Sequence, residues 1–319
     1  MTRRARLVTL VLSLLPGLLA GCGGTTVPAV VSPAGAARAL PSGAHGRSLL
    51  YVSNGQDVLI YTYPRAKRIG SLSGFAGAYG LCTDAAQDIF VPFIYDNGGV
   101  YEFPHGGQSP IAFLGFSYGW AHGCSVDPKT GSLAVIGGPE FGEEGTYVTV
   151  YHHKAKRGWR LGRTYPMPNA IGEYCAYDDA SNLFCDGKTS SGTFVLDELP
   201  SGASAFSSLS VDQTIDAPGG IQWDGAHLAI GDSNASPSTI YQFDIEGSAA
   251  RKTGATPLDG SNDAQQFWIQ GKTVIAPDPK RYCGSSDGCI GLYAYPAGGS
   301  AVATIPQRSA TGAAVSLRP

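Results

Sequence analysis

Charged side chains are scarce in this sequence: Asp, Glu, Lys and Arg together make up 15% of its 319 residues. They form no basic stripe, which argues against nucleic acid as a partner. Loss of an N-terminal segment containing Arg3, Arg4 and Arg6 would leave 19 of the 22 Lys and Arg against 25 Asp and Glu, a net charge of about −6. Glycine, by contrast, accounts for 44 residues. Few charges with abundant glycine and tyrosine favour many short strands joined by tight turns.

A long apolar run is also missing. The stretch from residue 7 to 19, interrupted by Ser13, Pro16 and Gly17, is shorter than the roughly 20 apolar residues that span a membrane. Because three arginines precede it and small residues follow it, we interpret it as a secretory signal.

The end of this segment, Leu19-Ala20-Gly21-Cys22, resembles the lipobox of bacterial lipoproteins. The resemblance implies removal of residues 1–21 and attachment of fatty acyl chains, such as palmitate, to Cys22. It places the mature protein in the cell envelope, lipid-anchored and facing the periplasm or the exterior. An ordinary signal peptide followed by an incidental cysteine is the alternative. Residues 22–47, rich in Gly, Ala, Pro, Val and Thr, are expected to form a flexible tether to a domain at 48–319.

Two short elements recur through residues 48–319, and each occurs six times. The first is an apolar strand ending in an aromatic-rich tetrad, at residues 61–64, 101–104, 151–154, 197–200, 241–244 and 293–296. The second is a mostly glycine-led strand that runs into a polar turn, at residues 80–84, 123–127, 174–178, 220–224, 266–270 and 312–316. With the apolar strand after each turn and a fourth, less regular strand, each unit has the size of a propeller blade, roughly 40–50 residues.

The repeats predict an all-β fold, a six-bladed β-propeller with four antiparallel strands per blade. Helical periodicity is not convincing beyond the leader. The strand at 49–53 lacks a glycine-led partner before it, and the strand at 312–316 lacks a partner after it. We expect residues 49–53 to pair with 313–317 and close the ring, which removes two free sheet edges. A β-sandwich with coincidental repeats is the alternative.

These units resemble six-bladed propellers of the NHL and YVTN type, whose repeat runs roughly Gly-Ile-Ala-Val-Asp, then a strand ending Tyr-Val, then Val-x-Val-Tyr. Residues 80–84 and 123–127 match the opening, 50–54 match the second strand and 58–61 match the third. The resemblance covers nearly all of 48–319 and implies the propeller fold. It implies no activity, because such folds carry unrelated functions.

Apart from Cys22, six cysteines remain, and an even number in an exported protein indicates disulfides. Their positions in the repeats predict the pairs Cys82–Cys124, Cys175–Cys185 and Cys283–Cys289. The first pair occupies the same strand of consecutive units, one register position apart, and would meet across the interface. The second faces across a hairpin, and the third clips a turn-rich loop. Six cysteines allow 15 connectivities, so other pairings stay open.

In a propeller, the innermost strand of each blade begins at one mouth of the central channel. The residues just before the glycine-led strands therefore predict a rim, which consists of Tyr79, His122, Glu173, Gly219, Gln265 and Thr311, with Trp120 close to His122. Aromatic, imidazole, carboxylate and amide groups together suit ligand binding, although any wet channel mouth is polar. We expect Trp223 and Trp268 to pack between blades.

Two catalytic alternatives involve this rim. His122 and Glu173 could hydrogen-bond, which would raise the pKa of His122 and suit a general base, but no nucleophile accompanies them. Gluconolactonase-like propellers hold a divalent cation at the channel mouth with Glu, Asn and Asp, and here Glu173, Asn262 and Asp263 would be the ligands of Ca²⁺ or a similar ion. The last two come from one unit, whereas that family spreads its ligands over more blades.

The sequence therefore favours a membrane-anchored binding or scaffold lipoprotein, a monomer without a cofactor or resident metal, over an enzyme. Its expected partners are the membrane, through the lipid anchor, and an unidentified glycan, peptide, small molecule or protein. A metal-dependent, lactonase-like hydrolase is the alternative.

Overall fold

The computed structural model describes residues 40–41, 43–94, 98–139, 145–154, 158–168, 171–283 and 286–318, without the side chains of 282, 283 and 286. Within these ranges every regular element is a β-strand, apart from one short 3₁₀-helix, η1 (Ala44–Gly46). The all-β prediction is confirmed. The predicted leader, Cys22 and most of the predicted tether lie outside the described residues.

Packing on the sheets begins before residue 48, where the sequence places the end of the tether. Leu40 packs against a hydrophobic cluster, and its N–H donates to Oε1 of Gln108 at 3.0 Å. Ala44 is buried. The described part of 40–47 therefore contacts the domain instead of acting as a free linker.

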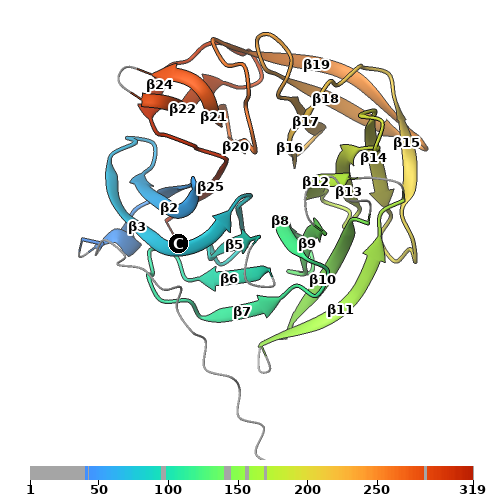
Figure 1. The fold of residues 1–319 in the computed structure, drawn as a ribbon, viewed down its shortest axis with the longest axis horizontal. Coiled ribbons are helices and arrows are strands. Elements are labelled where there is room, and N and C mark those ends of the chain that lie inside the picture. The colour runs from blue at the N-terminus through green and yellow to red at the C-terminus, as the bar shows by residue number, and fades with distance from the viewer. Residues whose placement is uncertain are drawn as a thin grey trace, which may run out of the picture.

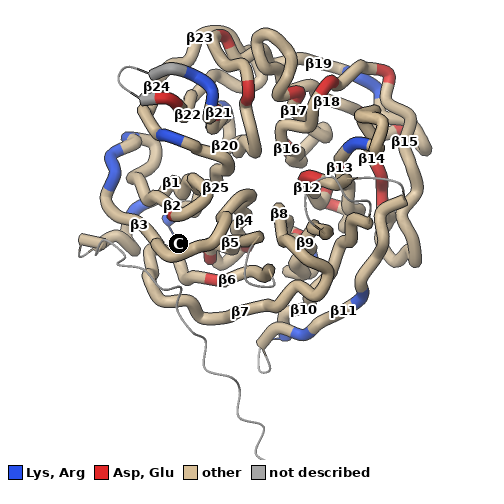
Figure 2. The backbone as a smooth tube through the Cα atoms, in the orientation of Figure 1, with Lys and Arg blue, Asp and Glu red and all other residues tan. Residues whose placement is uncertain are grey.

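Antiparallel runs of four strands recur along the chain and surround a common centre (Figure 1). Figure 2 shows Lys and Arg on the outer part of this arrangement. The first run combines both ends of the described chain: β25 (Gly312–Ser316), β1 (Leu49–Ser53), β2 (Gly55–Thr62) and β3 (Arg68–Ala78). The second is β4 (Cys82–Thr83), β5 (Ile89–Phe93), β6 (Gly99–Phe103) and β7 (Ala112–Gly115). The third is β8 (Trp120–Val126), β9 (Leu133–Gly138), β10 (Tyr147–Lys154) and β11 (Gly158–Pro166).

The remaining three runs follow the same order. The fourth is β12 (Ile171–Tyr177), β13 (Leu183–Lys188), β14 (Phe194–Leu199) and β15 (Ser207–Val211). The fifth is β16 (Pro218–Trp223), β17 (Leu228–Asp232), β18 (Thr239–Glu246) and β19 (Ala249–Asp259). The sixth is β20 (Trp268–Gln270), β21 (Thr273–Cys283), β22 (Ser286–Ala294) and β24 (Ala303–Pro306), while β23 (Gly299–Ser300) pairs with β19.

Additional backbone contacts join some neighbouring runs. Ala78 of β3 bridges to Phe93 of β5, and β15 pairs in parallel with the start of β19. The hydrogen-bonded sheets consequently contain eight, four, nine and four strands, not the separate four-stranded sheets expected from the repeats. The cause is the close approach of strands from adjacent runs. β1 and β25 pair from Leu49↔Ser316 to Ser53↔Gly312, so the first and last described strands are neighbours.

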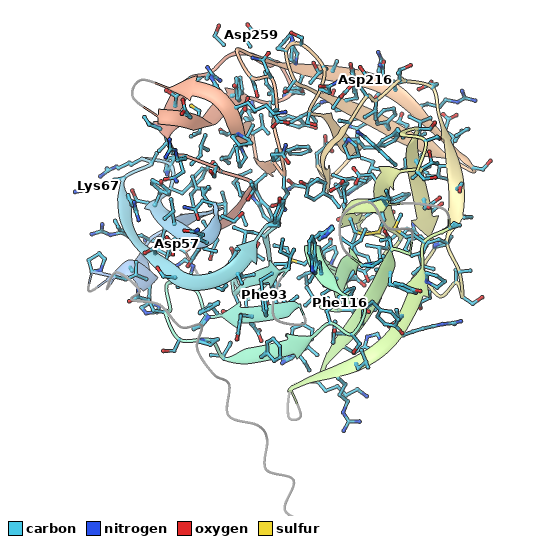
Figure 3. All side chains as sticks on the ribbon, in the orientation of Figure 1. Asp57, Lys67, Phe93, Phe116, Asp216 and Asp259 are labelled. Carbon is cyan, nitrogen blue, oxygen red and sulfur yellow. A yellow bond between two sulfur atoms is a disulfide. The ribbon has the colours of Figure 1, made fainter. Side chains whose placement is uncertain are left out.

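Hydrophobic side chains fill the spaces between neighbouring runs (Figure 3). They form six clusters, and each cluster draws its core from two adjacent runs. In one of them, Phe90 of the second run packs with Leu133 of the third. β1, β5, β9, β17 and β25 are buried along their whole length, because both of their faces meet a neighbour. Full burial of one Val, Leu, Ile or Phe side chain in these clusters stabilises the folded state by roughly 1.5–3 kcal/mol.

Candidate functional site

The second recurring element supplies the strands nearest the centre, β25, β4, β8, β12, β16 and β20 (Figure 2). Close approach explains its leading glycines. A Cβ on Gly80 would lie 2.9 Å from the carbonyl oxygen of His122, and one on Gly312 would lie 2.4 Å from that of Tyr79. Gly220 has a φ of +99°, a region that only glycine enters readily. A side chain at these positions would push the innermost strands apart.

Gln266 reaches across the centre. Its Oε1 accepts the N–H of Leu81 at 2.8 Å, and its Nε2 donates to the carbonyl oxygen of Leu81 at 2.6 Å. Gln266 precedes β20 and Leu81 precedes β4, and β25 lies between them, with Gly312 bridged to Gln266. The Gln266 side chain is 8% exposed. The side-chain amide of Gln266 therefore occupies space between the innermost strands.

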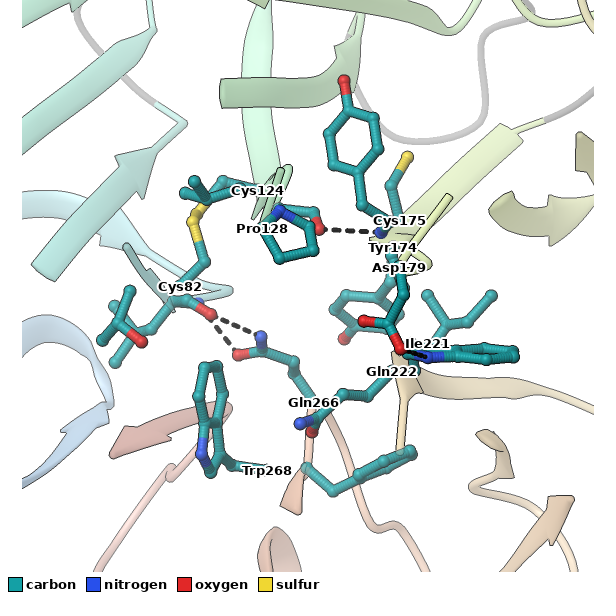
Figure 4. Close-up of a pocket in the computed structure, with 18 residues that line it drawn as sticks. Cys82, Cys124, Pro128, Tyr174, Cys175, Asp179, Ile221, Gln222, Gln266 and Trp268 are labelled. Atoms are coloured by element: carbon teal, nitrogen blue, oxygen red, sulfur yellow. Dashed lines mark hydrogen bonds between the residues drawn. A yellow bond between two sulfur atoms is a disulfide. The ribbon is translucent and has the colours of Figure 1, made fainter. Parts of the chain in front are cut away.

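A cavity of about 220 Å³ lies where the innermost strands end (Figure 4). Its wall is built by β4, β8, β12, β16 and β20 and by the turns that follow them. Figure 4 shows Gln266, Trp268 and Asp179 on different sides of the same space. The wall thus combines aromatic rings, amides, hydroxyls and a carboxylate from several strands, in residues Thr83, Ser125, Tyr174, Tyr177, Asp179, Gln222, Trp223, Gln266 and Trp268.

Hydrogen bonds fix most polar groups of this wall. Gln222 on β16 donates through Nε2 to the carbonyl oxygen of Ile269 at 3.0 Å and accepts its N–H at 2.7 Å. Ser125 Oγ accepts the N–H of Tyr177 at 3.0 Å. The indole Nε1 of Trp223 donates to Oδ2 of Asp179 at 3.0 Å. Asp179 is exposed, so its carboxylate is oriented by Trp223 and also faces solvent.

In four of the six repeats, the aspartate that ends the repeat holds the following turn. Oδ1 of Asp178 accepts two backbone N–H groups of its own turn at 2.8 Å, and Asp127 and Asp224 make similar bonds in theirs. Such side-chain bonds stabilise turns locally. Asp179, the residue after Asp178, is left to project toward the cavity.

The predicted rim residues lie at the opposite ends of the innermost strands. Their rings gather there: the centroids of Tyr79 and His122 are 6.3 Å apart, and those of Trp120 and His122 are 6.4 Å apart. Thr311 Oγ1 lies 3.2 Å from the hydroxyl of Ser53. The remaining rim positions also have neighbours in the fold, since Gln265 donates to Asp263 at 2.9 Å and a Cβ on Gly219 would meet the carbonyl oxygen of Ala264.

The expected rise in the pKa of His122 is not found. Burial lowers the pKa of His122 to about 4, with a hydrogen bond to the backbone of Gly172 as the smaller, opposing effect. Burial raises the pKa of Glu173 to about 7, and the Lys188 charge opposes this rise. Burial also raises the pKa of Asp186 on β13, whose Oδ1 accepts the N–H of Tyr174 at 3.0 Å. Removal from water therefore dominates this end of the channel and keeps His122 neutral at pH 7.

Of the groups expected to hold a cation, the carboxylate of Asp263 has other partners. Oδ1 of Asp263 accepts from Gln265, and its Oδ2 lies 3.2 Å from Nζ of Lys280. The N–H of Asn262 donates to Asp278 at 2.9 Å.

Within the described ranges, the carboxylates close enough to share a metal ion are instead Asp84, Asp88 and Glu102. Oε2 of Glu102 accepts the Trp159 indole N–H at 2.7 Å, and burial raises the pKa of Glu102 to about 7. Glu173, the central ligand of the predicted cation site, is not part of this group.

Two of the predicted disulfides are confirmed, Cys82–Cys124 and Cys175–Cys185. Cys175 and Cys185 lie opposite each other on β12 and β13, and Cys82 joins β4 to Cys124 on β8. Cys289 is also disulfide-bonded, but the side chain of its predicted partner, Cys283, lies outside the described residues. Cys82, Cys124 and Cys175 line the cavity, and the Cys82–Cys124 disulfide joins β4 to β8 within its wall.

Sequence reasoning does not single out Asp179, Gln222 or Gln266, and it assigns Trp223 and Trp268 to packing. In the structure both indoles pack against hydrophobic clusters and also line the cavity. The sequence signal for these residues was the polar turn that ends each repeat. These turns lie at the end of the innermost strands opposite the predicted rim, where the cavity is found.

Comparison with known proteins shows the fold. No protein-family model matches the chain, and a search of curated proteins found no relative. A chain in the crystal structure of a nidogen/laminin complex matches with a TM-score of 0.65 and 13% identity, over 86% of this chain and 99% of its own length. A protein of unknown function from Bacteroides caccae matches with a TM-score of 0.60 and 10% identity, over 86% and 100%. With the all-β strand arrangement, these likenesses show that the chain has a β-propeller-like fold.

Proposed function

We propose that this chain is an extracytoplasmic binding or scaffold protein whose ligand occupies the central cavity. The observation that carries the proposal is the cavity itself, about 220 Å³ in volume, with aromatic and polar walls and with Gln266 at its inner side. Proteins bind small ligands in largely preformed concave sites with a few placed polar groups. The disulfides in the wall support a preformed site, which lowers the entropy lost on binding.

We propose a six-bladed propeller as the architecture. Support comes from the six four-stranded runs, from the six hydrophobic clusters between them and from the pairing of β1 with β25. In this proposal the joined sheets are blades whose edges touch, and the first blade contains strands from both ends of the domain. The repeat type of the blades is proposed to be that of the NHL and YVTN propellers, on the motifs at 80–84 and 123–127.

We propose that the protein is anchored to the membrane through a lipid on Cys22. The support is the lipobox-like segment 19–22 and the disulfides, which are consistent with an extracytoplasmic protein. In the described part of the chain, no helix is long and apolar enough to cross a membrane. A Cys22→Ala variant should move from the membrane fraction to the soluble fraction or stay unprocessed, and unchanged processing and fractionation would contradict the anchor.

Binding is proposed, not catalysis, because structural hydrogen bonds already engage the amides of Gln222 and Gln266 and the hydroxyl of Ser125.

The predicted rim is proposed as a second contact surface at the opposite end of the innermost strands, where three rings gather. Its residues are Tyr79, Trp120, His122, Glu173, Gln265 and Thr311.

A blocking substitution tests which end holds the ligand. Thr83 is half-buried and lines the cavity, so Thr83→Phe should fill it, while Thr253→Phe on the outer strand β19 is the matched control. Ligands that raise the melting temperature of the wild type should lose that effect in Thr83→Phe and keep it in the control. If the effect survives Thr83→Phe and is lost in Tyr79→Ala, the ligand binds at the rim and the proposal for the cavity is wrong.

A further inference from the structure

We propose that the central cavity binds an organic cation, an ammonium or guanidinium group carried on an apolar or peptide body. This inference rests on the proposed function, in that it names the ligand class of the same cavity. It follows from the charge of the wall, the aromatic rings in it and a second acidic hollow that shares Trp223 with it.

The charge of the wall is negative. Asp179 is the one charged side chain among the described residues that line the cavity, and no Lys, Arg or His accompanies it there. The indole N–H of Trp223 holds its Oδ2 at 3.0 Å, so the carboxylate has a set position. A ligand anion would meet this carboxylate without a compensating cation, whereas a ligand cation would be attracted to it.

Aromatic rings surround the same space. Trp268 and Tyr177, both half-buried, line the cavity together with Trp223. Ring faces attract ammonium and guanidinium groups by about 0.5–2 kcal/mol each, most strongly for tryptophan. A carboxylate beside several aromatic rings therefore favours a bulky, weakly hydrated cation over a small metal ion, which requires several oxygen ligands.

A second hollow, here called the groove, adjoins the cavity at Trp223 and is also acidic. It is about 610 Å³ in volume, shares Trp223 with the cavity and is lined by the carboxylates of Asp178, Glu198, Asp244 and Glu246. Among its described lining residues no Lys or Arg is present. Burial, and then the Asp178 charge, raise the pKa of Glu198, as expected for crowded carboxylates. A chain with two positive groups could place one in the cavity and the other in this groove.

Choline and its uncharged isostere, the alcohol in which carbon replaces the nitrogen, provide a direct test with the full-length protein. Isothermal titration should show choline binding, with the isostere roughly tenfold weaker because it keeps the shape and loses the charge. Asp179→Asn should weaken choline binding by about fivefold. Asp259→Asn, at the outer edge of the fold (Figure 3), is the matched control and should leave binding unchanged.

A lysine-containing peptide, acetyl-Lys-Gly-Lys-amide, distinguishes the two sources of such a cation. Tighter binding than choline, weakened by Glu246→Gln in the groove, indicates a basic peptide, while equal affinities indicate a small free amine. Both outcomes support the inference. Equal binding of choline and its isostere, no effect of Asp179→Asn, or no binding of either cation overturns it. If a neutral ligand then binds and is lost in Thr83→Phe, the proposed function stands without the cation, and if no ligand depends on Thr83→Phe, both fail.

Discussion

Gln266 and Leu81, 185 positions apart in the sequence, are joined by a pair of hydrogen bonds in which a side-chain amide replaces the backbone of a partner strand. Gln222 makes the same pair of bonds with Ile269. Two glutamines thus link innermost strands, and Gln266 does so beside Gly80 and Gly312. Their amides act as structural links that also form part of the cavity wall.

Replacement of Gln266 by leucine should destabilise the fold. The change keeps the approximate volume but leaves the N–H and carbonyl oxygen of Leu81 without their partner, at a cost of about 1–3 kcal/mol per buried group. We expect urea denaturation to show a total loss of about 2–4 kcal/mol. Gln56→Leu, on the exposed side of β2, is the control and should change the free energy of unfolding little. Equal effects of the two substitutions would show that the bridge contributes nothing.

Glu173→Gln should change how stability depends on pH. Because burial raises the pKa of Glu173 from 4.5 to about 7, the folded state binds this proton more tightly than the unfolded state. The stabilisation is complete below about pH 4.5 and is lost as the pH rises through 7. Relative to the wild type, the variant should gain about 1–3 kcal/mol between pH 4.5 and 8. Urea denaturation across this range measures it, and a difference that does not vary with pH would contradict the raised pKa.

Breaking the Cys82–Cys124 disulfide should cost more stability than breaking Cys175–Cys185. The first closes a loop with a sequence separation of 42, the second one of 10. Loop-closure entropy then gives about 4 kcal/mol for the first and about 3 kcal/mol for the second. The comparison uses double Cys→Ser variants of each pair in the same denaturant series. The reverse order would show that strain or contacts, not loop entropy, determine the difference.

Trp159→Phe should raise the pKa of Glu102 further. The indole N–H of Trp159 donates to Glu102 and opposes the effect of burial on that pKa, while the ring packs edge-on against Phe90. Phenylalanine keeps an aromatic ring but removes the donor. The loss of stability should therefore be larger at pH 8, where Glu102 is ionised, than at pH 5, where it is protonated, by about 1–2 kcal/mol. Equal losses at both pH values would indicate that only packing changed.

The sequence predicts the strands and the disulfides well, because these depend on local patterns. Each polar turn ends a five-residue motif, so register can be counted back from the turn along the chain. Cys175 and Cys185 are predicted to face each other for this reason, and β12 and β13 place them there. The leading glycines Gly80, Gly220 and Gly312 also mark innermost strands correctly, since a Cβ there would lie too close to neighbouring atoms.

The site is less predictable, because it depends on contacts between distant segments. Nothing near Gln266 indicates that its side chain reaches Leu81, and nothing near Trp223 indicates that its indole contacts Asp179. The pKa of His122 shows the same limit: a neighbouring glutamate can be read from the repeat, but the burial that dominates the shift requires the full fold. The packing of Leu40 could not be predicted for a similar reason, since Leu40 contacts residues far along the chain.

The pairing of β1 with β25 imposes an order on assembly. β1 is among the first strands of the domain to be synthesised, yet one of its two edges stays open until residues 312–316 have been made. A chain that stops before them presents a buried, apolar strand with unpaired backbone groups, which is a template for association with other chains. Loss of residues 312–316 should therefore expose the free edge of β1 at the N-terminal end of the domain. The expected result is aggregation of the protein, not a local defect near the C-terminal end.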